Sequence, residues 1–144
     1  MPLDPAIHAA NRAATERIRA LGELTDDDLR TPVGEHWTVA ITLVHLAFWD
    51  RRSLHALQRS VEADRPVPTD LDIVLNDLSL PIWAAVPPRD AVRLALDAAT
   101  DIDEFVATLE SPLADELLAS HVRWISRSLH RIEHLDEAEA ALQG

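Results

Sequence analysis

The chain has 144 residues, of which 47% are hydrophobic, and it carries a formal net charge of −12, so it is long enough for one domain with a buried core. This acidity argues against nucleic-acid binding and against attachment to an anionic membrane surface, because both partners are themselves negatively charged. Cys, Lys and Tyr are all absent, which excludes disulfide bonds, a cysteine nucleophile, a Schiff-base lysine and a P-loop lysine.

No segment of the sequence resembles a membrane span or an export signal. The longest apolar run, residues 39–49, is interrupted by Thr42 and His45 and is too short to cross a bilayer. The segment MPLDPAIHAA lacks both the basic start and the apolar stretch of a secretory signal. We therefore expect a cytoplasmic protein that forms a single domain over residues 1–144.

The first half of the chain predicts two long helices. Asp4 is a suitable N-cap before a proline at the first helical position, and it opens a helix expected to end near residue 21. The acidic stretch and the turn residues over 25–34 predict a loop. Thr38 is a good N-cap for a second helix that is expected to end near residue 62, before the prolines at positions 66 and 68.

The second half predicts a long connection and two further long helices. A shorter helix is expected over residues 70–78, with Thr69 as N-cap, and the prolines at 81, 87 and 88 are expected to interrupt the chain. The next long helix, over 89–109, shows a bundle-like spacing of three and four. Its apolar positions are Val92, Ala95, Ala99, Ile102, Val106 and Leu109. A short helical turn through residue 118 and a last helix over 121–142 complete an all-α four-helix bundle.

Three histidines on two of these helices are candidate metal ligands. His45 lies in the middle of the second long helix, and His130 and His134 lie four residues apart in the last one. Residues with this spacing stack on one face of a helix. Together the three imidazoles can supply three nitrogen ligands and leave one metal position open.

Each of these histidines also has an interpretation without a metal. The apolar neighbours of His45 predict a buried ring that can instead be hydrogen-bonded to a backbone carbonyl or a carboxylate. The leading apolar stripe of the last helix points roughly 120–180° away from the histidine pair, which predicts an exposed polar face. This stripe consists of Leu118, Val122, Ile125, Leu129 and Ile132. Ala138 and Ala141 continue the histidine face, as they would in a helix that is contacted on two sides.

Three segments resemble the DinB-like superfamily. GEHWTVAITLVHLAFWDRR resembles the part of these proteins in which a tryptophan opens the second helix and a histidine faces the bundle. LHRIEHLDEAEAAL resembles their C-terminal helix, and NDLSLPIW followed by PPRDAVRLAL is similar to their middle. The resemblance implies a DinB-like four-helix bundle, often a homodimer, with a divalent metal on three histidines, which here are His45, His130 and His134.

Some members of this superfamily use a low-molecular-weight thiol, among them mycothiol-dependent maleylpyruvate isomerase and the bacillithiol transferases. The isomerases have a His, Glu, His ligand set, and His130 stands where that Glu would be. The resemblance therefore implies a metal-dependent thiol transferase or isomerase, with that particular isomerase reaction in doubt. Other relatives have neither metal nor enzyme activity, so a stress-related binding or dimerisation module of the same fold is the alternative.

The expected enzyme has zinc or nickel as cofactor, since both suit imidazole ligands, and takes its sulfur from a thiol cosubstrate. Trp49 is expected to form a wall of the pocket for a small-molecule substrate. Arg52 or Arg127 is expected to bind a carboxylate of that substrate. Asp50 or Glu133 is expected to orient the imidazoles from behind.

Overall fold

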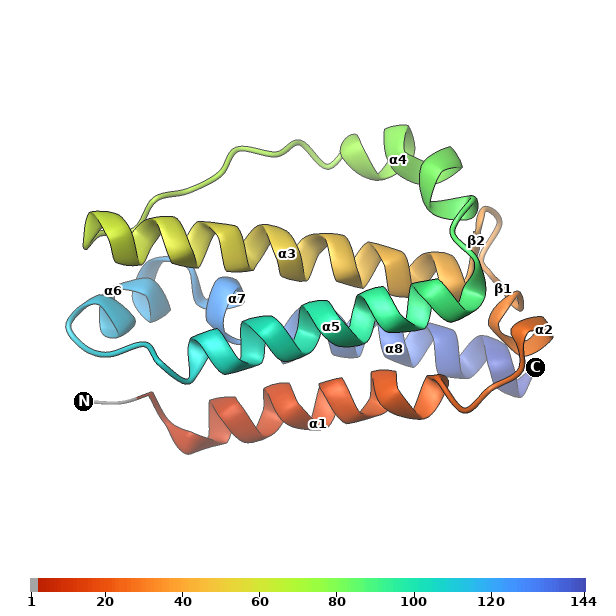
Figure 1. Ribbon diagram of the computed structural model, residues 1–144, viewed down its shortest axis with the longest axis horizontal. Coiled ribbons are helices and arrows are strands. Elements are labelled where there is room, and N and C mark those ends of the chain that lie inside the picture. The colour runs from red at the N-terminus through yellow and green to blue at the C-terminus, as the bar shows by residue number, and fades with distance from the viewer. Residues whose placement is uncertain (1–2) are drawn as a thin grey trace.

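Four long helices lie side by side in the computed structural model, which describes residues 3–144 (Figure 1). They are α1 (Pro5–Leu21), α3 (Val39–Ala63), α5 (Pro88–Val106) and α8 (Ser128–Gln143). Helix α3 packs mainly against α5, and α1 packs against both α5 and α8, so each long helix buries a face against its neighbours. This arrangement confirms the predicted all-α four-helix bundle.

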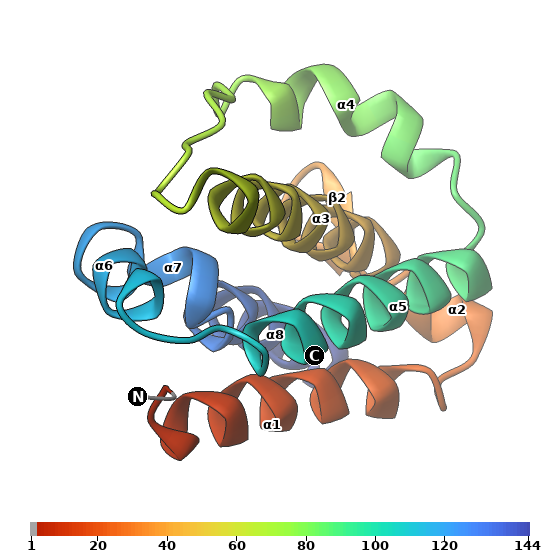
Figure 2. The same cartoon turned by 60° about the vertical axis from the view of Figure 1, so that its left-hand side comes forward.

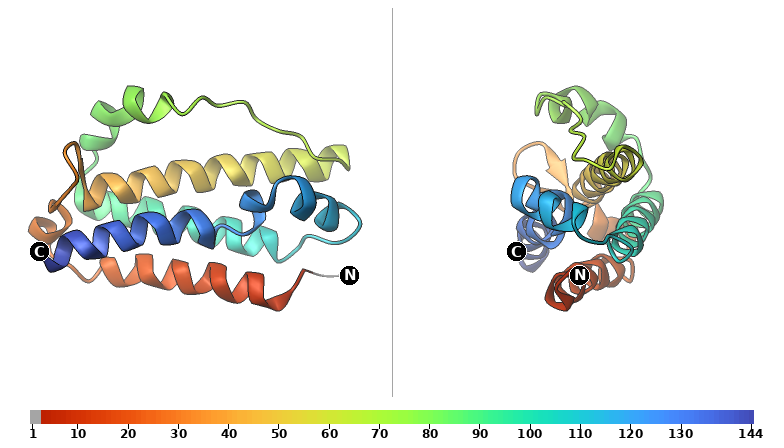
Figure 3. Two further views of the ribbon diagram at one scale, coloured as in Figure 1. Left: turned by 180° about the vertical axis from the view of Figure 1, so that it is seen from behind. Right: turned by 90° about the vertical axis from the view of Figure 1, so that its left-hand side faces the viewer.

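Short elements join the long helices. Between α1 and α3 lie α2 (Asp26–Leu29), β1 (Pro32–Val33) and β2 (Trp37–Thr38), and α4 (Leu75–Ala84) lies in the long connection between α3 and α5. Before α8 come α6 (Leu113–Ser120) and α7 (Val122–Ile125). The two strands pair antiparallel, Pro32 with Thr38 and Val33 with Trp37. Figure 2 shows α4 arching over α3, and Figure 3 shows the start of α1 and the end of α8 at opposite ends of the bundle.

The first two long helices begin where their caps predict. Asp4 Oδ1 accepts a hydrogen bond from the backbone N–H of Ala6 (2.9 Å), and Thr38 Oγ1 accepts one from that of Ile41 (3.1 Å), so both act as N-caps. In α5 the predicted apolar positions are buried, as is Leu109 just beyond it. Within residues 3–144, no helix has both the length and the apolarity needed to cross a membrane.

Two connecting segments differ from the prediction. The loop expected over 25–34 contains α2, because Thr25 Oγ1 accepts from the backbone N–H of Asp28 (3.1 Å) and caps a short turn of helix. The helix expected over 70–78 begins only at residue 75, because Asp72 Oδ1 accepts from the N–H of Val74 (3.1 Å) in a local turn that competes with helix formation. Pro81 does not break this helix but lies inside it.

The helix expected over 121–142 is broken between α7 and α8. Ser126 has φ −85° and ψ 72°, outside the helical range. The buried Asn11 of α1 satisfies the backbone groups that the break exposes. Its Nδ2 donates to the carbonyl of Ile125 (2.8 Å), and its Oδ1 accepts from the N–H of Ser128 (3.0 Å). This tertiary contact stabilises the break, because buried backbone groups without hydrogen-bond partners would destabilise the fold.

The apolar stripe predicted for the last helix is consequently wrong at three of its five positions, whereas Ile125 of α7 is fully buried and Leu118 of α6 is partly buried. Val122, Leu129 and Ile132 are 44%, 44% and 40% exposed. The face of α8 that meets the bundle is instead formed by Ser128, Arg131, Leu135 and Ala138. A hydrophobic pattern could not identify this face, because its first turns are occupied by a hydroxyl and a guanidinium. His130 and His134 therefore lie beside the buried face and not opposite to it.

Candidate metal centre

His45 of α3 and the α8 pair His130 and His134 direct their Nε2 atoms at one another. His45 Nε2 lies 3.1 Å from Nε2 of His130 and 3.1 Å from Nε2 of His134. A tetrahedral ion with nitrogen ligands at about 2.0–2.1 Å would separate its ligand atoms by about 3.3–3.4 Å. Nε2 of His45 is thus nearly as far from each of the other two as two ligands of one ion are from each other, and the three histidines form a group able to hold a metal.

Tryptophan rings surround the three imidazoles. Trp37, at the end of the hairpin, stacks on His134 with ring centroids 5.9 Å apart and an interplanar angle of 20°, and its centroid lies 4.8 Å from that of His45. Trp83 of α4 lies 5.7 Å from His45, and Trp49, one turn along α3, lies 6.4 Å from it. Among these rings His45 is buried and the other two imidazoles are partly buried, so a charge on them is poorly solvated.

The imidazoles are consequently neutral over a wide pH range. Burial, with the positive fields of His134 and Arg127, lowers the pKa of His45 to about 3. Burial and the neighbouring Arg127 lower the pKa of His130 to about 2. Burial also lowers the pKa of His134, although Glu137 and Glu133 oppose this shift. A metal ligand must be the neutral imidazole, so the site presents its histidines in the required form.

The hydrogen bonding around the rings also fits a bound cation. Nδ1 of His45 and Nδ1 of His134 are buried with no hydrogen-bond partner, and a carboxylate oxygen of Glu137 lies 3.9 Å from the latter. Nε2 of His45 contacts Nε2 of both other rings. A neutral imidazole offers a lone pair at Nε2 when its proton is on Nδ1, and three such lone pairs would be stabilised by a positive charge between them.

One contact of His130 departs from the usual arrangement of a metal-bound histidine. Arg127 Nη2 lies 3.2 Å from His130 Nδ1. A guanidinium has no acceptor, so this contact places the proton of the neutral ring on Nε2. If His130 held an ion through Nε2, its proton would have to be on Nδ1, and two donors would then face each other. Metal binding therefore requires the Arg127 head group to turn away from the ring.

Asp50 lies behind Arg127 in a buried charge network. Asp50 Oδ1 accepts from Arg127 Nε (2.7 Å), and its Oδ2 accepts from Arg131 Nε (3.0 Å). Arg131 is fully buried and also pairs with Asp103 at 3.0 Å. Asp50 thus acts on His130 only through Arg127 and contacts no imidazole itself. Glu133, the other carboxylate expected behind the rings, pairs with Arg123 at 3.3 Å on the surface.

A cavity of about 410 Å³ opens onto the histidines. Its lining residues are Trp37, His45, Trp49, Leu71, Ile73, Asn76, His130, Glu133 and His134. Trp49 is one of the residues that line this cavity, and its Nε1–H donates to Asn76 Oδ1 at 3.0 Å. This hydrogen bond ties the first turn of α4 to α3 beside the cavity. Asn76 and Arg131 carry no sequence signal for a role at this site, because their contacts with Trp49 and with Asp50 and Asp103 are tertiary.

The two arginines expected to bind a carboxylate differ in availability. Arg127 is buried, and its guanidinium is occupied by Asp50, by the carbonyl of Arg123 (2.8 Å) and by His130. Arg52 donates from Nη2 to the carbonyl of Thr69 (2.8 Å), whereas its Nε is buried without a partner. Of the two, only Arg52 retains a buried donor for a ligand.

Acidification is expected to destabilise the metal-free protein. The pKa of each imidazole in the folded chain lies below its ordinary value of about 6.5, so at lower pH the unfolded chain binds protons that the folded chain does not. The stabilisation is complete above about pH 6.5 and is lost progressively as the pH falls toward the lowered pKa values. Urea unfolding at about pH 7, 6 and 5 measures this decline.

A His134→Asn variant tests the cause of this pH dependence. It should lose stability with falling pH less steeply than the unaltered protein, by at most about 1.4 kcal/mol per pH unit, because one titrating ring is gone. Replacing the exposed His55 on α3 should leave the slope unchanged. Equal stability of the unaltered protein at about pH 7 and 5 would contradict the prediction.

The comparison with known proteins agrees with the geometry. The family model of the DinB superfamily matches residues 9–143. No curated protein and no solved structure shows a significant match to this chain. The family match covers nearly the whole chain and includes most of α1, all of α3, α5 and α8, and the three clustered histidines. The chain therefore belongs to the DinB superfamily.

Proposed function

We propose that this DinB-superfamily protein binds one divalent metal ion, zinc or nickel, and transfers or isomerises a small substrate with a low-molecular-weight thiol as cosubstrate. The convergence of three neutral imidazole nitrogens at the wall of a cavity of about 410 Å³ carries this proposal. Bound there, the ion would supply an open coordination position and a positive charge that favours thiolate over thiol.

The chain's own residues have distinct parts in this proposal. His45, His130 and His134 would hold the ion through Nε2, and tryptophan rings lie around the imidazoles. The Trp49–Asn76 hydrogen bond joins α4 to α3, and both of its residues line the cavity. The sulfur must come from the cosubstrate, because the chain has no Cys.

Metal analysis followed by cobalt substitution tests the proposal. Tag-free protein incubated with zinc or nickel is expected to retain close to one ion per chain after gel filtration. In the cobalt form, L-cysteine or 2-mercaptoethanol is expected to produce a thiolate-to-cobalt charge-transfer band, because a small thiol reaches the open position whatever its scaffold.

The two halves of the proposal fail separately in this experiment. Protein that retains no ion refutes the metal site and favours the non-enzymatic binding module. Protein that retains cobalt but shows no spectral change with either thiol refutes the thiol cosubstrate and leaves the metal site standing. His134→Ala, which lacks one ligand, is the control in which no charge-transfer band should develop.

A further inference from the structure

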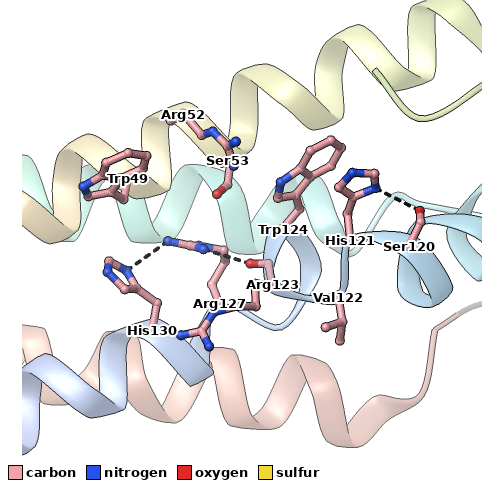
Figure 4. Close-up of a pocket in the computed structure, with 10 residues that line it drawn as sticks. All are labelled: Trp49, Arg52, Ser53, Ser120, His121, Val122, Arg123, Trp124, Arg127 and His130. Atoms are coloured by element: carbon pink, nitrogen blue, oxygen red, sulfur yellow. Dashed lines mark hydrogen bonds between the residues drawn. The ribbon is translucent and has the colours of Figure 1, made fainter. Parts of the chain in front are cut away.

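A second cavity, of about 460 Å³, adjoins the first one. Trp49 and His130 line both cavities, so the two meet at these side chains. Figure 4 shows the second cavity between α3, which contributes Trp49 and Arg52, and the α6–α7 segment, which contributes His121 and Trp124. A ligand here therefore lies next to one of the candidate metal ligands.

The charge of this cavity is opposite to that of the whole chain. Three arginines line it, Arg52, Arg123 and Arg127, and none of the described lining residues is Asp or Glu. The chain as a whole carries a net charge of −12. Such an acidic protein repels anions in general, so a carboxylate-free wall with three guanidinium groups marks the place where an anion is tolerated.

Of the three arginines that line this cavity, Arg52 is the one without an ion-pair partner among the described residues. Arg127 pairs with Asp50 at 2.7 Å, and Arg123 pairs with Glu133 at 3.3 Å. Among residues 3–144, no carboxylate forms an ion pair with Arg52, whose Nη2 instead donates to the carbonyl of Thr69. Its Nε is buried without a hydrogen-bond partner. A bound anion would satisfy this donor and the charge together.

Two tryptophans hold the Arg52 guanidinium in place. Its central carbon lies 6.0 Å from the ring centroid of Trp49 and 5.6 Å from that of Trp124, within the range of cation–π contacts. Burial lowers the pKa of Arg52, with Asp70 opposing the shift only in part. The guanidinium is thus positioned, partly desolvated and flanked by apolar rings, an environment suited to a planar anion on an apolar frame.

We propose that this second cavity binds an organic carboxylate on an apolar or aromatic frame, and that Arg52 is its principal anion-binding residue. The carboxylate binds between Trp49 and Trp124, beside His130. Its assignment as substrate or cosubstrate of the neighbouring reaction rests on the proposed function, whereas its binding does not. The guanidinium of Arg52 keeps its charge throughout the pH range in which a carboxylate is ionised.

Benzoate, its neutral isostere benzamide, and inorganic phosphate are the probes that test the proposal. Each is titrated into the full chain, zinc-loaded and chelator-treated, while the four indole N–H signals are followed by nuclear magnetic resonance. Benzoate is expected to shift Trp49 and Trp124, which line the cavity, and to leave the buried Trp83, which does not, in place. Benzamide should bind at least about tenfold more weakly, because it carries no charge.

Two neighbouring arginines provide a matched pair of variants. Arg52→Gln is expected to weaken benzoate binding at least about tenfold. Arg51→Gln should change it less than about twofold, because Arg51 forms an exposed pair with Asp101 and does not line the cavity. If Arg52→Gln fails to fold, the benzoate–benzamide comparison and the tryptophan signals of the unaltered protein still decide the matter.

The outcomes separate this proposal from the metal site. His134→Ala, which does not line the second cavity, should lose the metal and keep benzoate binding. Equal binding of benzoate and benzamide, a response centred on Trp83, or unchanged affinity in folded Arg52→Gln would each overturn the carboxylate site. Phosphate binding as tight as that of benzoate would overturn the proposal that the ligand has an apolar or aromatic frame. If the unaltered protein retains no metal after incubation with zinc but still binds benzoate, the proposed function is refuted and the carboxylate site stands.

Discussion

His45→Ala is expected to weaken zinc binding at least about a hundredfold, because loss of a ligand should exceed the 10–100-fold effect of losing an outer-shell partner. His45 is the one histidine of the cluster on α3, and its Nε2 lies 3.1 Å from Nε2 of both others. Without it, His130 and His134 are left as two ligands on a single helix. Competition with a chromophoric chelator, in tag-free protein, measures the affinity.

Thermal unfolding gives an independent measure of the same effect. Zinc at about a hundred times its Kd should stabilise the unaltered protein by about 2.7 kcal/mol, and it should leave His45→Ala almost unchanged. The control is His55→Ala, an exposed histidine on the same helix, which should respond to zinc like the unaltered protein. If His45→Ala folds and still binds zinc with unaltered affinity, the three-histidine site does not exist.

Asp50→Ala is expected to lower the free energy of unfolding by about 3–5 kcal/mol, the cost of removing one partner from a buried ion pair. Asp50 is 1% exposed and joins Arg127 and Arg131, which are 4% and 0% exposed. Without it, Arg127 has no ion-pair partner among residues 3–144, whereas Arg131 keeps Asp103. Urea unfolding at neutral pH measures the change.

Asp101→Ala is the matched control for this prediction. Asp101 also pairs with an arginine, Arg51, at 2.6 Å, but its side chain is 49% exposed. Its removal should cost less than about 1 kcal/mol, because exposed ion pairs contribute little. If Asp50→Ala is no less stable than Asp101→Ala, the buried network does not support the fold, and its role in holding Arg127 against His130 loses its basis.

Local sequence signals were sufficient to predict most of the long helices of the bundle. Asp4 and Thr38 cap the helices that they were predicted to cap, because an N-cap depends on the next two or three residues only. The apolar spacing of α5 predicted its buried face, since that face contains only apolar side chains. The DinB-like segments predicted the family, which the match over residues 9–143 confirms. They also identified three histidines that the structure brings together.

The sequence by itself therefore determined the bundle, its family and the chemical character of the site, since caps, periodicity and residue type are local properties. Only the tertiary structure decided which way the last helix faces and which arginine is free. Asn11 stabilises the break before α8 from more than a hundred residues away, and the buried face of α8 includes a charged Arg131 that no hydrophobic pattern selects. Arg127 and Arg52 are chemically identical in the sequence, but Asp50 neutralises the first. The charge of the second is left unpaired because compensation depends on which carboxylates the fold brings within a few ångströms.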